Sequence, residues 1–147
     1  MKTLKLLTCT MLLLVAMAAG AETISDVTIG NLVYSLDTDT KVATVTGYDS
    51  SNKPTDVVIP NTIEYGGNYS VTTIGEWAFC NCTSLASVNI PNSVTTIGES
   101  AFASCESLAS IDIPNSVMTI GERAFSHCSS LASVNIPNSV TTIGESA

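Results

Sequence analysis

A repeat of 23 residues constrains the fold of this chain more than any other feature. Isoleucines recur at this spacing as Ile74, Ile97, Ile120 and Ile143. Three further rows share the period: Phe79, Phe102 and Phe125; Leu85, Leu108 and Leu131; Pro91, Pro114 and Pro137. Residues 86–101 and 132–147 are identical over 16 positions, ASVNIPNSVTTIGESA. A fixed period of this length is typical of stacked repeats, so the sequence predicts a solenoid.

The first half of a unit, taken from residues 85–107, is predicted to be extended. Val88 and Ile90 alternate with polar neighbours, as on a half-buried strand. Pro91-Asn92-Ser93 is predicted as a turn, because proline has no amide hydrogen to continue a strand ladder. Val94 to Ile97 then forms a second short extended piece with two inward apolar residues.

The second half of the unit is predicted to contain a corner and a helical turn. Gly98 permits a corner conformation that a β-carbon resists. Glu99 to Ala103 is predicted as one helical or 3₁₀ turn that points Ala101 and Phe102 inward. One unit cannot bury its own apolar face, whereas stacked units share a continuous core and rise by about 4.8 Å each. The expected fold is a right-handed solenoid with short strands and short helical turns.

The residues before the regular repeats predict three further parts. Residues 1–21 have lysines, an apolar run and the small residues Ala19-Gly20-Ala21, which indicate a signal peptide cleaved after Ala21. A membrane anchor is the alternative, but the apolar run is short for a bilayer. Residues 22–56 are predicted as a β cap, with strands at Asn31–Leu36 and Lys41–Thr46. Residues 57–147 form the repeats, and the first coil carries a hairpin insertion at 62–70.

The last unit stops at Ala147, one residue before the expected Phe. This break within a unit predicts that the chain is the N-terminal piece of a longer protein, whose repeat number and downstream domains the sequence does not define.

The charge balance argues against nucleic-acid binding. Residues 22–147 contain three basic residues, Lys41, Lys53 and Arg123, against 13 acidic ones, a net charge of −10. Such a surface repels phosphate backbones and has no basic patch that could release counterions.

The run Ile-Pro-Asn-Ser-Val-Thr-Thr-Ile-Gly-Glu-x-Ala-Phe-x-x-Cys-x-x-Leu, from Ile90 to Leu108 and in its copies, resembles the BspA-like, or Treponema-type, leucine-rich repeats of bacterial surface proteins. The resemblance covers residues 57–147. It implies a leucine-rich-repeat fold in a secreted or cell-surface protein that works in adhesion, with host matrix or surface proteins or partner cells as ligands. It implies no shared catalytic residues and no cofactor.

The cysteines form a row of their own, because Cys82, Cys105 and Cys128 share one repeat position and Cys80 lies close by. One thiol per coil does not converge into the tetrahedral set that a metal needs, so no metal site is predicted. The row favours buried free thiols that pack as small apolar groups. A disulfide involving Cys80 is the main alternative, since export permits disulfides.

Two other polar patterns have no predicted catalytic role. His127 precedes Cys128, but adjacency in sequence does not create nucleophile–base geometry. Glu76, Glu99, Glu122 and Glu145 form a regular row at a turn, where they are predicted to solvate the surface or to lie near the N-terminus of the short helical turn, at which negative charge is favourable. We therefore predict that the chain is not an enzyme.

Outward positions of the first strand provide the candidate binding face. They are small and polar: Ser87, Asn89, Ser110, Asp112, Ser133 and Asn135. Extended solenoid faces commonly bind partners, so these residues predict contact with a protein or a glycan. The near-identity of the units supports an alternative function, a spacer or stalk that presents another domain.

Overall fold

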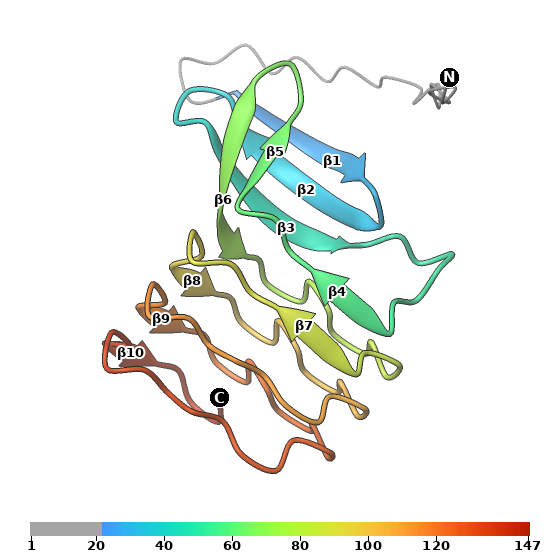
Figure 1. The fold of residues 1–147 in the computed structure, drawn as a ribbon, viewed down its shortest axis with the longest axis vertical. Helices are drawn as coiled ribbons and strands as arrows, with labels where there is room; N and C mark the ends of the chain where they lie inside the picture. Colours follow the sequence, from blue (N-terminus) through green and yellow to red (C-terminus); the bar gives the residue numbers. More distant parts are fainter. Residues whose placement is uncertain (1–21) are drawn as a thin grey trace.

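The computed structural model describes residues 22–147, which contain ten strands and no helix. The predicted signal peptide, residues 1–21, lies outside the described residues. Figure 1 shows a stack of coils that follow one another down the longest axis, below a group of longer N-terminal strands.

Three antiparallel strands form the N-terminal end of the stack: β1 (Thr23–Ile29), β2 (Leu32–Asp37) and β3 (Val42–Tyr48). Strands β2 and β3 match the two predicted strands to within two residues, whereas β1 was not predicted. Side chains alternate along β2, so that Leu32, Tyr34 and Leu36 are buried. In the turn after β2, the Asp37 carboxylate accepts hydrogen bonds from the amides of Asp39 and Thr40, both at 2.9 Å.

The main sheet continues from this end through one short strand per coil. Strand β3 pairs in parallel with β6 (Asn68–Ile74), and β6 pairs with β8 (Thr96–Ile97). Strands β9 (Thr119–Ile120) and β10 (Thr142–Ile143) extend the same parallel order. Ile74, Ile97 and Ile120 are therefore each paired with the isoleucine one period later. The insertion at 62–70 contains a hairpin, in which β5 (Thr62–Glu64) pairs antiparallel with β6.

A second, smaller sheet occupies the other side of the coils. Strand β4 (Asp56–Val58) pairs in parallel with β7 (Ser87–Asn89), and Figure 1 shows both across the coil from β8. In the next two coils the predicted strand shrinks to single bridges, from Asn89 to Asp112 and from Asp112 to Asn135. The outward residues of this sheet are thus aligned from coil to coil.

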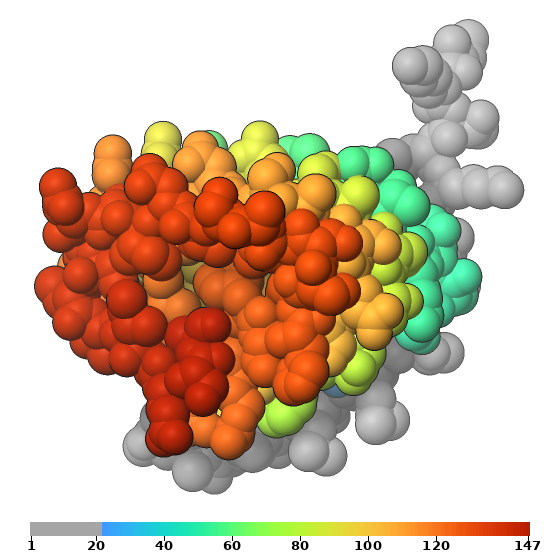
Figure 2. All heavy atoms as spheres, turned by 90° about the horizontal axis from the view of Figure 1, so that it is seen from below, coloured from blue at the N-terminus to red at the C-terminus, as the bar shows by residue number. Residues whose placement is uncertain are grey.

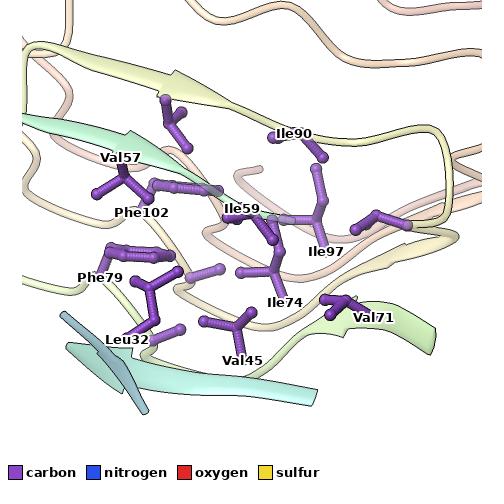
Figure 3. Packing of buried hydrophobic residues seen from close by; sticks show 14 of the residues in the cluster. Leu32, Val45, Val57, Ile59, Val71, Ile74, Phe79, Ile90, Ile97 and Phe102 are labelled. Atoms are coloured by element: carbon purple, nitrogen blue, oxygen red, sulfur yellow. The ribbon is translucent and has the colours of Figure 1, made fainter. Parts of the chain in front are cut away.

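The space between the two sheets is filled by rows of identical apolar side chains. Figure 3 shows Ile74 and Ile97 one above the other, with Phe79 next to Phe102. The aromatic row is a stack of nearly parallel rings from Tyr48 through Phe79 and Phe102 to Phe125, with centroids 6.1, 5.3 and 5.5 Å apart. Offset stacking of this kind contributes about 0.5–1.5 kcal/mol per pair beyond burial. The predicted inward residues Ala101 and Phe102 are both fully buried.

The predicted helical turn is wrong, because amides in this segment bond alternately to two partners. The amides of Ser100 and Phe102 donate to the carbonyls of Glu122 and Ala124 in the next coil, both at 2.8 Å. The Ala101 amide between them donates back to the Gly98 carbonyl at 3.4 Å. Ser100 has a φ of 50°. A helix needs a continuous right-handed backbone whose amides bond within the segment. Because every second amide here bonds to another coil, the segment is not a helix.

Gly98 has a different role from the predicted one. The glycines with positive φ are Gly30, Gly66 and Gly67, and Gly98 is not among them. A β-carbon on Gly98 would lie 2.7 Å from the backbone nitrogen of Glu76 in the preceding coil. The glycine is needed because two backbones approach closely, and not because the chain turns through a left-handed conformation.

Candidate binding face

The six predicted face residues are all exposed, and the structure arranges them in columns along the stack: Ser87, Asn89, Ser110, Asp112, Ser133 and Asn135. Backbone bridges place Asn89, Asp112 and Asn135 directly above one another. Val58, 73% exposed, precedes them in the same column because it pairs with Asn89. The predicted face is therefore a continuous surface in the structure.

Ser87 differs from its counterparts in later coils because it has an acidic partner. It lies opposite Asp56 in the β4–β7 pair, and its hydroxyl donates a hydrogen bond of 2.5 Å to the Asp56 carboxylate. The Ser87 hydroxyl, together with that of Thr55, lowers the pKa of Asp56. The Ser87 hydroxyl is thus already hydrogen bonded, whereas the side-chain amides of Asn89 and Asn135 in the neighbouring column remain available for a partner.

A shallow groove of about 850 Å³ runs along one edge of this face. We call it the Asn-Pro groove, because it is lined by the Val/Asn/Asp-Ile-Pro-Asn segments of four coils. These segments are residues 58–61, 89–92, 112–115 and 135–138. The groove crosses the coils, so a molecule lying in it would meet the same chemical groups once per coil.

The groove contains a column of asparagines that the sequence interpretation treated only as turn residues. Asn61, Asn92, Asn115 and Asn138 line the groove and are exposed. The signal for them was present, since the same asparagine follows each proline of the repeat. It was missed because Pro-Asn is also an ordinary turn pair.

Prolines form the floor between the two polar columns. Pro91 is buried and Pro114 half-buried, whereas Asn89 and Asn92 on either side are exposed. Within residues 22–147, Asn81 is the one asparagine whose side chain donates a hydrogen bond within the protein, and its acceptor is the Cys80 sulfur at 3.3 Å. The groove asparagines therefore present free amides above a floor of aliphatic rings.

The cysteine row is a set of free thiols in the structure. Cys80, Cys82, Cys105 and Cys128 are not in disulfides. The sulfurs of Cys105 and Cys128 donate to the carbonyls of Phe79 and Phe102 in the preceding coil, at 3.2 and 3.1 Å. The neighbouring Cys128 thiol and burial both raise the pKa of Cys105. The Cys105 thiol is accordingly held protonated, and it serves as a buried packing group.

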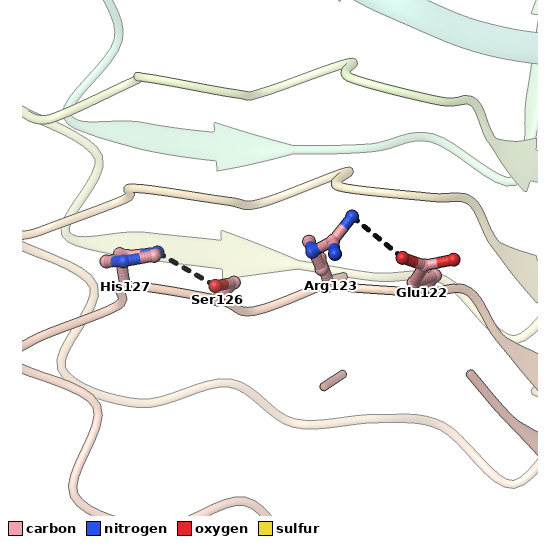
Figure 4. A network of polar contacts seen from close by, with 4 residues as sticks. All are labelled: Glu122, Arg123, Ser126 and His127. Carbon is pink, nitrogen blue, oxygen red and sulfur yellow. Dashed lines mark hydrogen bonds and ion pairs between the residues drawn. The ribbon is translucent and has the colours of Figure 1, made fainter. Parts of the chain in front are cut away.

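His127 and the glutamate row are not among the residues that line the groove. Figure 4 shows His127 beside Ser126, whose hydroxyl is 2.8 Å from His127 Nδ1. Arg123 forms an ion pair with its neighbour Glu122 at 2.7 Å. His127 is thus hydrogen bonded to a serine and not to Cys128. In residues 22–147, no three His, Cys, Asp or Glu side chains are grouped closely enough to hold a metal ion.

Comparison with known families identifies the class of protein. The family described as BspA type leucine rich repeat region (6 copies) matches residues 48–147. The chain belongs to this family. The matched residues include both groove columns, the thiol row and the aromatic stack.

Solved structures of bacterial leucine-rich-repeat proteins are similar to this one. A leucine-rich repeat protein from Bacteroides capillosus is 32% identical with a TM-score of 0.65, covering 83% of this chain and 99% of that one. The T. pallidum leucine rich repeat protein is 29% identical with a TM-score of 0.63, covering 82% and 65%. A protein from Bacteroides ovatus is 28% identical with a TM-score of 0.55, covering 81% and 37%. No functionally curated protein matches the chain. The described part, residues 22–147, contains no helix that is long and apolar enough to cross a membrane.

Proposed function

We propose that this chain is an exported, non-catalytic binding protein of the adhesion type, which contacts a protein or glycan at the cell surface through its exposed first-strand face. The observation that carries the proposal is the alignment of Asn89, Asp112 and Asn135 in one exposed column beside the Asn-Pro groove. Aligned polar groups on a rigid stack bind without first being ordered, which lowers the entropic cost of association.

The test uses purified residues 22–147 on arrays of extracellular-matrix proteins, mucins, glycans and bacterial cells. We expect saturable binding to at least one class. Asn135→Arg places a long charged side chain on the face and should abolish binding, whereas Asn52→Arg, at an exposed position away from the groove, is the matched control. Absence of saturable binding to every class would contradict the proposal.

Export is the second part of the proposal and is tested separately. Expression of the full chain in a secreting bacterium, followed by N-terminal sequencing of the external protein, should show Glu22 as the first residue. Retention of the protein inside the cell, or an intact Met1 on the external product, would contradict export with cleavage after Ala21.

A spacer function is the second candidate, and the identity of residues 86–101 and 132–147 supports it. Recognition surfaces vary between repeats more often than spacers do. In-frame deletion of residues 108–130 removes one period and rejoins matching positions. A spacer keeps its function and only becomes shorter, whereas a binding face loses affinity.

A further inference from the structure

We propose that the Asn-Pro groove binds an extended, uncharged glycan that lies along the stack with one sugar ring per coil. This inference rests on the proposed binding function and assigns it a ligand class and a site. Three properties of the groove support it: its period, its hydrogen-bonding groups and its charge.

The period of the groove fits a sugar chain better than a peptide. Parallel pairing places successive coils about 4.8 Å apart. An extended peptide advances about 6.7 Å for every two residues, so across four coils it would drift from the asparagine columns by about 6 Å. A chain of pyranose rings joined through equatorial bonds advances by about one ring per coil. Each ring can therefore meet the same pair of side chains.

The side chains that line the groove have the hydrogen-bonding capacity that sugars need. An asparagine side chain offers two donors and an acceptor, and a sugar hydroxyl both donates and accepts. Asn89 and Asn92 belong to opposite columns of the same coil, with Pro91 between them. A ring above the proline could contact both amides with its edge hydroxyls, while its C–H face packs on the proline ring. The exposed Val58 and the 41% exposed Ile136 add apolar contacts in the end coils.

The charge of the groove selects an uncharged ligand. Among the groove residues, Asp112 is the one with a formal charge. The surrounding chain carries 13 acidic residues and few basic ones. Uronic acids, sulfated sugars and sialic acids would be repelled, because the groove supplies no cation to neutralise them. Neutral hexose or N-acetylhexosamine chains meet no such penalty.

The test is a calorimetric titration of residues 22–147 with β-1,4-linked oligomers of glucose, mannose and N-acetylglucosamine containing two to six sugars. We expect one neutral series to bind with an affinity that rises up to four sugars and then levels off, because four coils line the groove. Oligogalacturonates of the same lengths are the anionic comparison and should not bind.

Variants locate the site within the molecule. The double substitution Asn92→Ala and Asn115→Ala should lower affinity by about tenfold or more, since it removes hydrogen bonds to two sugars. Asp112→Asn restores the residue type of the adjacent coils and should keep or strengthen binding. Asn52→Ala, outside the groove, should leave affinity unchanged. Circular dichroism of each variant reports folding, and Asn115→Asp provides a nearly isosteric second test that should also weaken binding.

Several outcomes would overturn the inference. Neutral glycan binding that ignores the Asn92 and Asn115 substitutions would place the ligand elsewhere. Preference for the anionic series, or groove-dependent binding of a peptide instead, would contradict the ligand class. If no neutral glycan binds while the array experiment still shows a saturable protein or cell partner, the groove assignment fails and the proposed binding function survives. If both experiments are negative, both proposals fail.

Discussion

Residues 86–101 and 132–147 have the same sequence but different surroundings. Ile97, in the first copy, is completely buried, whereas Ile143, at the same position of the second copy, is 55% exposed. Ile90 is 6% exposed and its counterpart Ile136 is 41% exposed. Burial in this fold therefore depends on the neighbouring coil as much as on the residue. Stability should follow position in the stack, as expected when each repeat contacts only its neighbours.

The largest effect is expected in the aromatic stack. Phe102 is fully buried between two rings, while Phe125 is half-buried and stacks on one. Phe102→Ala should lower the free energy of unfolding of residues 22–147 by about 4 kcal/mol, through lost burial and a cavity. Phe125→Ala should cost about 2 kcal/mol. Urea denaturation followed by circular dichroism measures both, and equal losses would contradict the dependence on position.

A cleaner comparison uses the two identical segments. Ile97→Ala should cost about 3 kcal/mol because it empties a closed site between coils. Ile143→Ala should cost less than about 1 kcal/mol, since this side chain remains largely in water. The same urea experiment applies. A loss at Ile143 as large as that at Ile97 would show that the unit's own sequence, and not its neighbours, determines the energy.

Thiol reactivity gives a kinetic version of the comparison. Cys82 and Cys105 are buried, whereas Cys80 and Cys128 are half-buried. In native protein, Cys105 should react with a disulfide reagent about a hundredfold more slowly than Cys128. This ratio of rates corresponds to a free energy of about 2.8 kcal/mol for the local opening that exposes Cys105. Mass spectrometry of the labelled peptides assigns the rates. A Cys105→Ser variant provides the control, because removal of the Cys105 thiol should remove only the slow phase assigned to Cys105.

The smallest effect concerns Ser87 and Ser133, which occupy the same position of the identical segments. The Ser87 hydroxyl donates a hydrogen bond to the Asp56 carboxylate and lowers its pKa in the folded state. The hydrogen bond therefore stabilises the fold above the pKa that Asp56 has in the unfolded chain. This stabilisation is lost as the pH falls through the lower pKa of the folded state. Ser87→Ala should therefore lower Tm slightly at about pH 7 and not at about pH 2. Ser133→Ala should change Tm at neither pH. A decrease that persists in acid would exclude Asp56 as its cause.

The rows of identical residues explain why much of the fold was predictable. Two strands of the N-terminal region, the paired isoleucines and the inward phenylalanines all follow from periodicity and alternation. The helical turn at Glu99–Ala103 was wrong because local preference does not reveal that alternate amides bond to another coil. Strand β1 was missed because Ser25 and Asp26 interrupt its apolar pattern, where its pairing also shifts register.

The candidate face was only partly predictable for a related reason. Alternation along one strand identifies Ser87 and Asn89 as outward residues, and the structure confirms their exposure. The groove depends on how Pro91 and Asn92 of one coil sit beside those of the next. Such a surface arises between units, so the sequence of a single unit does not reveal it.

The hydrogen bonds between coils also determine how the molecule should respond to mechanical force. Bonds such as that from the Gly121 amide to the Ile97 carbonyl, at 2.8 Å, connect neighbouring coils. Tension applied to the outermost coil should load the bonds of one interface at a time, so that coils detach in succession. Each detached period of 23 residues would add about 80 Å of extended chain. Under the drag of flowing fluid, such a stack would yield in equal steps and dissipate load before its longer N-terminal strands separate.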